Sequence, residues 1–139
     1  MPKLEYTLAI YPFHIDAIGH VNNIIYIQWM EIGRVQLLNA VDMPTEQIAK
    51  EGFGPALVET TISYKTPLYL GDTVTANIWI SKLRGASANM DFEFFNQKGD
   101  VAATGSQRGL FIDLTSKKPK RLSVQQRSRF VTYLIEPDA

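Results

Sequence analysis

Ten residues near the N-terminus carry the side chains best suited to chemistry. The run HIDAIGHVNN, residues 14–23, contains the carboxylate of Asp16, the imidazole of His20 and two asparagines directly before a predicted helix. The start of a helix presents unpaired backbone amides and the positive end of the macrodipole, so it can stabilise an oxyanion that develops on a carbonyl. A carboxylate beside those amides could act as nucleophile or general base. The pattern therefore suits acyl transfer or hydrolysis.

The same run also fits a purely structural role. A loop rich in Asp, Gly and Asn before a helix is typical of turn and cap chemistry. Asn22 or Asn23 is expected to cap the helix, because a side-chain oxygen there can accept an amide of the first turn. His20 could contact a substrate or hold the turn. The residues alone leave both interpretations open.

The apolar run that follows predicts the helix that positions this loop. Residues 23–39, NIIYIQWMEIGRVQLLN, are apolar on nearly all sides, and only Gln28, Glu31 and Arg34 form a narrow polar line. Such a helix is expected to be buried on most sides. Glu31 and Arg34 lie three residues apart, so an ion pair between them is expected.

The rest of the chain is mostly strand-like. Residues 4–11 predict a first strand, and alternating apolar and polar residues predict four more after the helix. Those four cover residues 56–66, 73–83, 86–96 and 101–114. Gly105 and Gly109 are expected bend or bulge points. This order favours an α+β fold, with an antiparallel sheet wrapped around one long central helix, in a single domain over residues 1–139.

Composition excludes several classes of protein. The 14 basic residues equal the 14 acidic ones, which argues against a nucleic-acid partner. With no cysteine and two histidines, the chain offers no disulfide and no thiolate, and no metal site is expected. The N-terminus does not read as a signal peptide, and no run reaches the ~20 apolar residues of a membrane span. We therefore expect a cytoplasmic protein.

Three segments, in order, resemble the 4-hydroxybenzoyl-CoA thioesterase-like branch of the hotdog superfamily. DAIGHVNNIIYIQWMEIGR resembles the family's D-x-D-x-x-G-H-V-N-N, then Y, then W-x-E-x-x-R. SYKTPLYLGDTV resembles Y-x-x-P-x-x-x-G-D, and VAATGSQRGLFID resembles V-A-x-G-x-x-x-x-x-F-x-D. The resemblance runs from Tyr11 to about Leu122. It implies the hotdog fold and hydrolysis of an acyl-CoA thioester to free acid and CoA, without a cofactor beyond the coenzyme A of the substrate.

The resemblance also assigns roles to single residues. It implies that Asp16 attacks the thioester carbonyl or activates a water, and that a backbone amide near Asn23 polarises that carbonyl. His20 is a further catalytic candidate. His14 stands where the family has the first aspartate of D-x-D, which leaves the proposed catalytic group in place.

Substrate binding is expected to involve a second set of residues. The phosphates and adenine of coenzyme A require basic and hydrogen-bonding groups. The candidates for these groups are Lys65, Arg84 and Ser87, with Arg108 and the basic run Lys117–Arg121 in addition. Asn22, Tyr26 and Trp29 are expected to contact other parts of the substrate. A solvated surface is the simpler interpretation of that basic run. An acyl pocket lined by Ile18, Tyr26, Trp29 and Phe53 would suit a fatty or an aromatic acyl group equally.

The family's basic unit is a dimer whose sheets join edge to edge, often paired again into a homotetramer. We expect the same here, with the active site at the interface. Three alternatives stay open: an acyl-carrier-protein thioesterase, a non-catalytic acyl-binding module, and a hotdog dehydratase using His20 and Glu31. Asp16 argues against the binding module, and the W-x-E-x-x-R context argues against the dehydratase.

Overall fold

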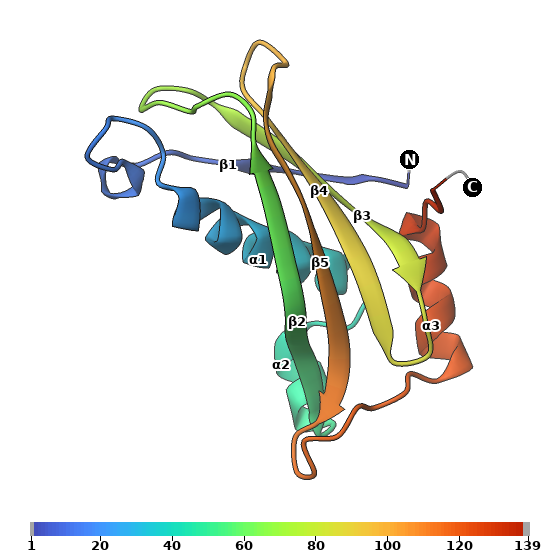
Figure 1. The fold of residues 1–139 in the computed structure, drawn as a ribbon. Coiled ribbons are helices and arrows are strands. Elements are labelled where there is room, and N and C mark those ends of the chain that lie inside the picture. The colour runs from blue at the N-terminus through green and yellow to red at the C-terminus, as the bar shows by residue number, and fades with distance from the viewer. Residues whose placement is uncertain (1, 138–139) are drawn as a thin grey trace.

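The computed structural model describes residues 2–137, and these form a curved antiparallel sheet with helices beside it (Figure 1). The strands are β1 (Leu4–Leu8), β2 (Phe53–Tyr64), β3 (Val74–Leu83), β4 (Ser87–Phe95) and β5 (Val101–Asp113). The helices are α1 (Asn23–Ala40), α2 (Thr45–Lys50) and α3 (Val124–Phe130), with 3-10 turns η1 (Pro12–His14) and η2 (Val131–Tyr133). The predicted α+β class is confirmed.

The strand order is β1-β3-β4-β5-β2, and every neighbouring pair is antiparallel. Consecutive hairpins join β3, β4 and β5. The earlier strand β2 pairs with β5 on the far side from β4. The two edges of the sheet are therefore β1 and the 12-residue β2. An edge strand leaves a row of backbone amides and carbonyls unpaired.

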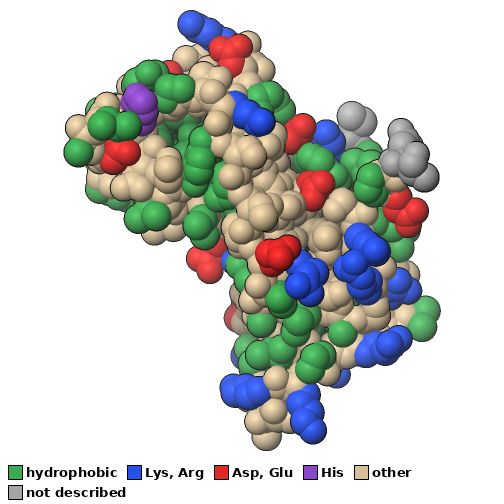
Figure 2. Space-filling model, viewed as in Figure 1, with side chains coloured by type: hydrophobic (Ala, Val, Ile, Leu, Met, Phe, Trp, Pro, Cys, Tyr) green, Lys and Arg blue, Asp and Glu red, His purple; other side chains and the backbone are tan. Residues whose placement is uncertain are grey.

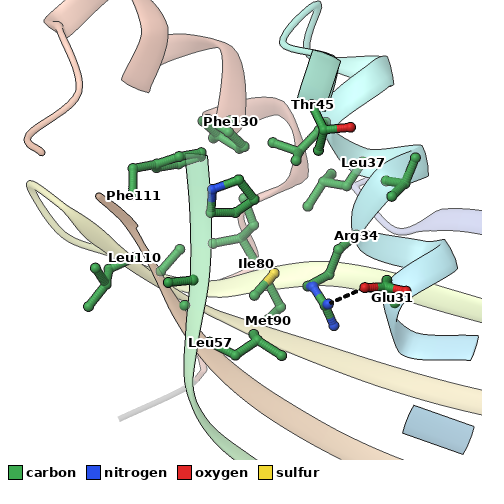
Figure 3. A pocket seen from close by; sticks show the side chains of 16 residues that line it. Glu31, Arg34, Leu37, Thr45, Leu57, Ile80, Met90, Leu110, Phe111 and Phe130 are labelled. Atoms are coloured by element: carbon green, nitrogen blue, oxygen red, sulfur yellow. Dashed lines mark ion pairs between the residues drawn. The ribbon is translucent and has the colours of Figure 1, made fainter. Parts of the chain in front are cut away.

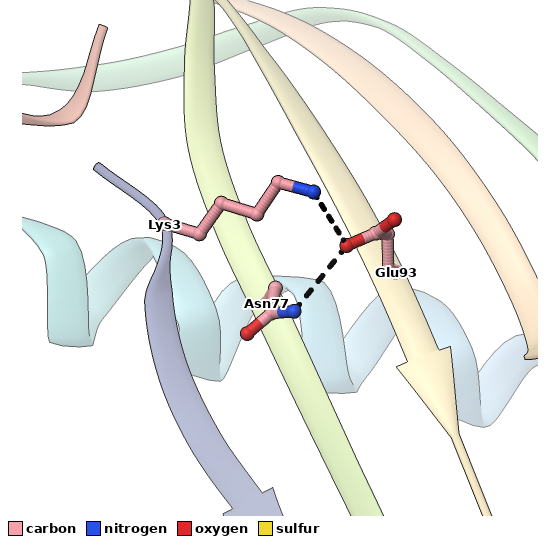
Figure 4. Close-up of polar contacts among 3 residues, drawn as sticks. All are labelled: Lys3, Asn77 and Glu93. Carbon is pink, nitrogen blue, oxygen red and sulfur yellow. Dashed lines mark hydrogen bonds and ion pairs between the residues drawn. The ribbon is translucent and has the colours of Figure 1, made fainter. Parts of the chain in front are cut away.

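The inner face of the sheet follows the predicted alternation. Val74, Ala76, Ile78 and Ile80 of β3 are at most 1% exposed, because they point toward α1, while the residues between them face outward. On the outer face, the Lys3 ammonium lies 3.1 Å from a Glu93 carboxylate oxygen that also accepts a bond from Asn77 (Figure 4). This contact fastens the short edge strand to its neighbours.

Glycines allow the helix to approach the sheet closely. A Cβ at Gly105 of β5 would overlap the Met30 side chain of α1 and lie 2.8 Å from the Thr61 carbonyl oxygen. The strand register runs through Gly105 without a shift. The register shift between Leu57 and Glu59 of β2 lies opposite Gly109, so the expected irregularity is found at Gly109 and not at Gly105.

Only one side of α1 is covered. Its core row, which includes Tyr26, Met30 and Leu37, is buried. On the other side Ile24 is 61% and Ile27 is 43% exposed, so the expectation that the helix is buried on most sides is wrong for the single chain. The backbone of α1 lies nearest to β1 and β3, whereas side-chain contacts such as that of Arg34 with Gln107 reach β5. Among residues 2–137, no helix is long and apolar enough to cross a membrane.

Candidate active site

The loop before α1 is held closed by its own backbone. The Asn22 amide donates to the His14 carbonyl at 2.8 Å, and the Asp16 amide donates to the His20 carbonyl at 2.9 Å. Gly19 has φ of 87°, which a residue with a side chain adopts only with strain. Asp16, His20 and the first residues of the helix are therefore brought into one compact unit.

The Asp16 carboxylate is fixed by backbone amides. Its Oδ1 accepts bonds from the amides of Ile18 at 3.1 Å and His20 at 3.3 Å. Its Oδ2 accepts no hydrogen bond from any of the described residues 2–137. The half-buried side chain thus combines one anchored oxygen with one oxygen that can reach a substrate or a water.

The start of α1 leaves one amide unpaired. Asn22 is the N-cap, and its Oδ1 accepts the Ile24 amide at 3.1 Å, as one of the two predicted caps should. The amide of Asn23 has no acceptor within the described part of the chain. It lies at the positive end of an 18-residue helix, where it can donate to a developing oxyanion.

Tyr64, which was not among the residues expected at the site, contacts the start of α1. At the end of β2, its phenolic oxygen donates to the Asn23 carbonyl at 3.0 Å. Its ring packs edge-on against Tyr26, and partial burial raises the pKa of the Tyr64 phenol above its usual value. The sequence contained a signal for this residue, because Tyr64 is the tyrosine of the family's Y-x-x-P segment.

The two histidines occupy different environments. The half-buried His20 ring lies edge-on to Tyr69, with centroids 5.1 Å apart. His14 is buried, its Nδ1 accepts the Tyr11 amide at 3.0 Å, and its ring lies edge-on to Trp29. The imidazole at the family's first aspartate position is therefore built into the support of the loop.

The other expected binding residues fall into three places. Tyr26 and Trp29 are 3% and 2% exposed, so in the single chain they form the aromatic core behind the loop, and burial raises the pKa of Tyr26 to about 12. Lys65 is exposed just beyond the end of β2 that carries Tyr64. Arg84 and Ser87 form the β3–β4 turn, at the opposite end of the molecule from the loop (Figure 1).

Glu31 and Arg34 form only a loose ion pair. The Arg34 Nη2 lies 3.8 Å from Glu31, whereas its Nη1 donates to the Gln107 Oε1 at 2.7 Å. Gln107 is 2% exposed and in turn donates to the Thr60 hydroxyl at 3.2 Å. Burial lowers the pKa of Arg34, and the nearby Glu31 opposes that shift. Arg34 therefore ties α1 to β5 and β2.

A cavity of about 360 Å³ opens beside Arg34, between the C-terminal half of α1 and the inner face of the sheet (Figure 3). Its lining is predominantly apolar and includes Val35, Leu38, Ala56, Leu57, Ile80, Ala88, Met90, Gly109, Phe111 and Phe130. None of the expected acyl-pocket residues Ile18, Tyr26, Trp29 and Phe53 contributes to it.

Basic side chains gather at the end of the molecule that carries α3 (Figure 2). Residues 101–137 contain seven Lys or Arg but only Asp113 and Glu136 as acids. Lys117, Lys118 and Arg121 are exposed there. Although the net charge is zero, the charges are unevenly distributed, and this end of the molecule has a positive surface that could accept phosphate groups. Among the described residues, no group of three or more His, Asp or Glu could hold a metal ion.

Comparison with known proteins places the chain in a family. Residues 12–130 match the model of the thioesterase-like superfamily. YneP of Bacillus subtilis, a candidate acyl-CoA thioesterase, is 29% identical over 104 residues, which cover 75% of this chain and 75% of that protein. The chloroplastic acyl-acyl carrier protein thioesterase ATL3 of Arabidopsis thaliana is 29% identical over 139 residues, which cover 97% of this chain and 71% of that protein.

The fold is similarly matched. The crystal structure of a DHNA-CoA thioesterase from Staphylococcus aureus superposes with a TM-score of 0.83 at 22% identity, covering 86% of this chain and 80% of that one. The hotdog fold expected from the sequence is thereby confirmed. The chain belongs to the thioesterase-like superfamily and is a thioester hydrolase.

Proposed function

We propose that this protein hydrolyses acyl-CoA thioesters at the loop that precedes α1. Two features of one compact loop carry the proposal: among residues 2–137, the Asp16 Oδ2 accepts no hydrogen bond and the Asn23 amide has no acceptor. A carboxylate and an oxyanion donor are the two groups that hydrolysis of a thioester requires.

The reaction can follow either of two balanced routes. As a base, Asp16 takes a proton from water while the water oxygen bonds to the thioester carbon; the C–S bond then breaks and the sulfur receives the proton. As a nucleophile, the carboxylate oxygen bonds to that carbon and expels the CoA thiolate, and water then cleaves the mixed anhydride. In both routes the Asn23 amide donates to the carbonyl oxygen as negative charge develops there.

Self-association completes the proposed site. The unpaired edge of β2 and the exposed apolar side chains Leu57, Ile24 and Ile27 offer a surface for a second copy. Antiparallel pairing of two β2 strands about a two-fold axis would set Phe53 of one copy near Tyr64 of the other. The basic end of one protomer would then approach the Asp16 loop of its partner, where the phosphates of CoA need positive charge.

The test is thiol release from a panel of acyl-CoAs and from matching acyl-carrier-protein thioesters. Release from the CoA series supports the proposal, and release from carrier-protein thioesters alone would favour the reaction named for ATL3. A single turnover in ¹⁸O-labelled water tests the nucleophile route, because label in the Asp16 carboxylate requires that an anhydride forms and that water attacks its aspartyl carbon. Thiol release from none of these substrates would refute the proposal.

A further inference from the structure

We propose that the cavity beside Arg34 receives the distal part of a long aliphatic acyl chain, so that the enzyme favours thioesters of long-chain acids. This inference rests on the proposed function, because it takes the thioester carbonyl to lie at the Asn23 amide. It adds the substrate class, which the loop chemistry leaves open.

The cavity has the size and lining of a ligand site. A volume of about 360 Å³ falls within the range of small-molecule pockets, which is ~300–1,000 Å³. Small residues keep it open, because Ala56, Ala88 and Gly109 stand on the inner sheet face where larger side chains would fill the space. A Cβ at Gly109 would already lie 3.3 Å from the Met90 Cε. Phe111 and Phe130 line the cavity on the side of α3 (Figure 3).

One face of α1, apolar except for Glu31, leads from the helix start to the cavity. Ile24 and Ile27 lie on the same face of α1 as Glu31, Val35 and Leu38, because these positions are separated by three, four and four residues and then by three. Both isoleucines are exposed, and Val35 and Leu38 line the cavity. Ile24, Ile27 and Val35 therefore lie along one face of α1 that leads to the buried Leu38, and Glu31 is the one charged residue on that face.

The length of this path determines which acyl chains can use it. At 1.5 Å per residue, Glu31 lies ~12 Å and Leu38 ~22 Å along the helix from Asn23. An extended alkyl chain advances about 1.25 Å per carbon, given C–C bonds near 1.5 Å. A chain of eight carbons would stop short of the cavity, whereas sixteen carbons would occupy it.

The polar groups at the wall argue for an uncharged occupant. The Arg34 guanidinium donates to Gln107 at 2.7 Å and lies 3.8 Å from the Glu31 carboxylate, so it already has two partners. A second anion would have to compete with both partners. A hydrocarbon tail needs only the apolar lining, and a second protomer on the exposed face of α1 would cover its path.

The experiment compares chain-length profiles of kcat/KM for octanoyl-CoA and hexadecanoyl-CoA. Ala88→Leu adds bulk inside the cavity, and Val35→Phe does so from the helix side. Thr104→Leu is the matched control, because Thr104 lines a groove on the outer face of the same sheet. We expect wild type and the control to prefer hexadecanoyl-CoA, and both cavity variants to lose about tenfold or more on it while octanoyl-CoA changes little.

The ratio of kcat/KM for the two substrates distinguishes a change in specificity from misfolding, because misfolding would lower kcat/KM for both substrates. Equal rates on both chains in wild type, or an unchanged ratio in both cavity variants, would overturn the inference while Asp16-dependent hydrolysis could still stand. Binding of octyl and hexadecyl thioethers of CoA, which cannot be hydrolysed, tests the cavity separately from the chemistry. Cavity variants that change only the oligomeric state, measured by light scattering, would show that a second copy fills the space, and this also overturns the proposal.

Discussion

The phenolic oxygen of Tyr64 donates to the carbonyl of Asn23 at 3.0 Å, so the end of β2 is tied to the first turn of α1. The amide of the same residue, Asn23, is the proposed oxyanion donor. Because Tyr64 lies on the edge strand and Asn23 follows the Asp16 loop, this bond couples the sheet edge to the proposed oxyanion donor.

Tyr64→Phe should therefore affect catalysis more than stability. The ring is 45% exposed and Phe retains its packing, so we expect the free energy of unfolding to fall by about 1 kcal/mol or less. The rate constant kcat should fall about tenfold, because the carbonyl of Asn23 loses the donor that holds it. Urea unfolding and steady-state kinetics measure the two effects. A kcat equal to that of wild type would remove Tyr64 from the site.

We expect His14 to contribute to the stability of the fold and not to the chemistry. His14→Ala removes a buried ring and the acceptor of the Tyr11 amide, and we expect unfolding to become easier by about 2–3 kcal/mol. His14→Phe keeps most of the packing and loses only the acceptor, so it should cost about 1 kcal/mol. Chemical denaturation of both variants checks the order. Equal costs would mean that the packing of His14 against Trp29 contributes little.

Gly105 and Gly54 make a matched pair of strand glycines. Gly105→Ala places a methyl group against Met30 and the Thr61 carbonyl, so we expect a loss of about 1–3 kcal/mol. Gly54→Ala meets only Leu114 at 3.5 Å and should be neutral or slightly stabilising. Thermal and urea unfolding would compare them. A Gly105→Ala protein as stable as wild type would contradict the close approach of α1 to β5.

Asp91 on the outer sheet face should make stability depend on pH. Burial raises the pKa of Asp91, Glu93 adds to the rise, and a hydrogen bond from Ser81 opposes it. The folded chain then holds its proton more tightly than the unfolded chain, so the free energy of unfolding falls as the pH rises from the ordinary value through the raised one.

Asp91→Asn should therefore stabilise the protein at pH 7, and the gain should vanish below the ordinary aspartate pKa. Melting temperatures of wild type, Asp91→Asn and the exposed control Asp100→Asn, taken from pH 3 to pH 8, measure this. A gain that persists at the acid end would point to a cause other than titration.

Local patterns predicted the elements well because each follows from short-range physics. The alternation through Val74 to Ile80 gave β3 and its buried face, and the cap at Asn22 gave the start of α1. The Asp16 loop could be found from its residue types alone. These signals lie within a few consecutive residues.

The remaining features depend on contacts between distant segments. Nothing local places β2 beyond β5 at the sheet edge, so the exposed side of α1 was not foreseen. The short bond from Arg34 to Gln107 joins residues 73 positions apart, so it could not be foreseen, whereas the expected ion pair of Arg34 with Glu31 is present at 3.8 Å. The cavity likewise arises from small residues on three strands.

The most direct test of the account replaces one atom of Asp16. Asn at this position keeps an Oδ1 that can accept the amides of Ile18 and His20, so Asp16→Asn preserves the loop and removes the charge. Asp42→Asn is the control, since it makes the same charge change at an exposed residue with φ of 59°, a conformation that Asn tolerates.

Thiol release from the preferred acyl-CoA is then measured for wild type and both variants, with the fold and oligomer size checked in parallel. We expect the control to match wild type and Asp16→Asn to lose about a thousandfold or more in kcat. Equal release by Asp16→Asn and wild type would contradict the central claim that this carboxylate performs the hydrolysis.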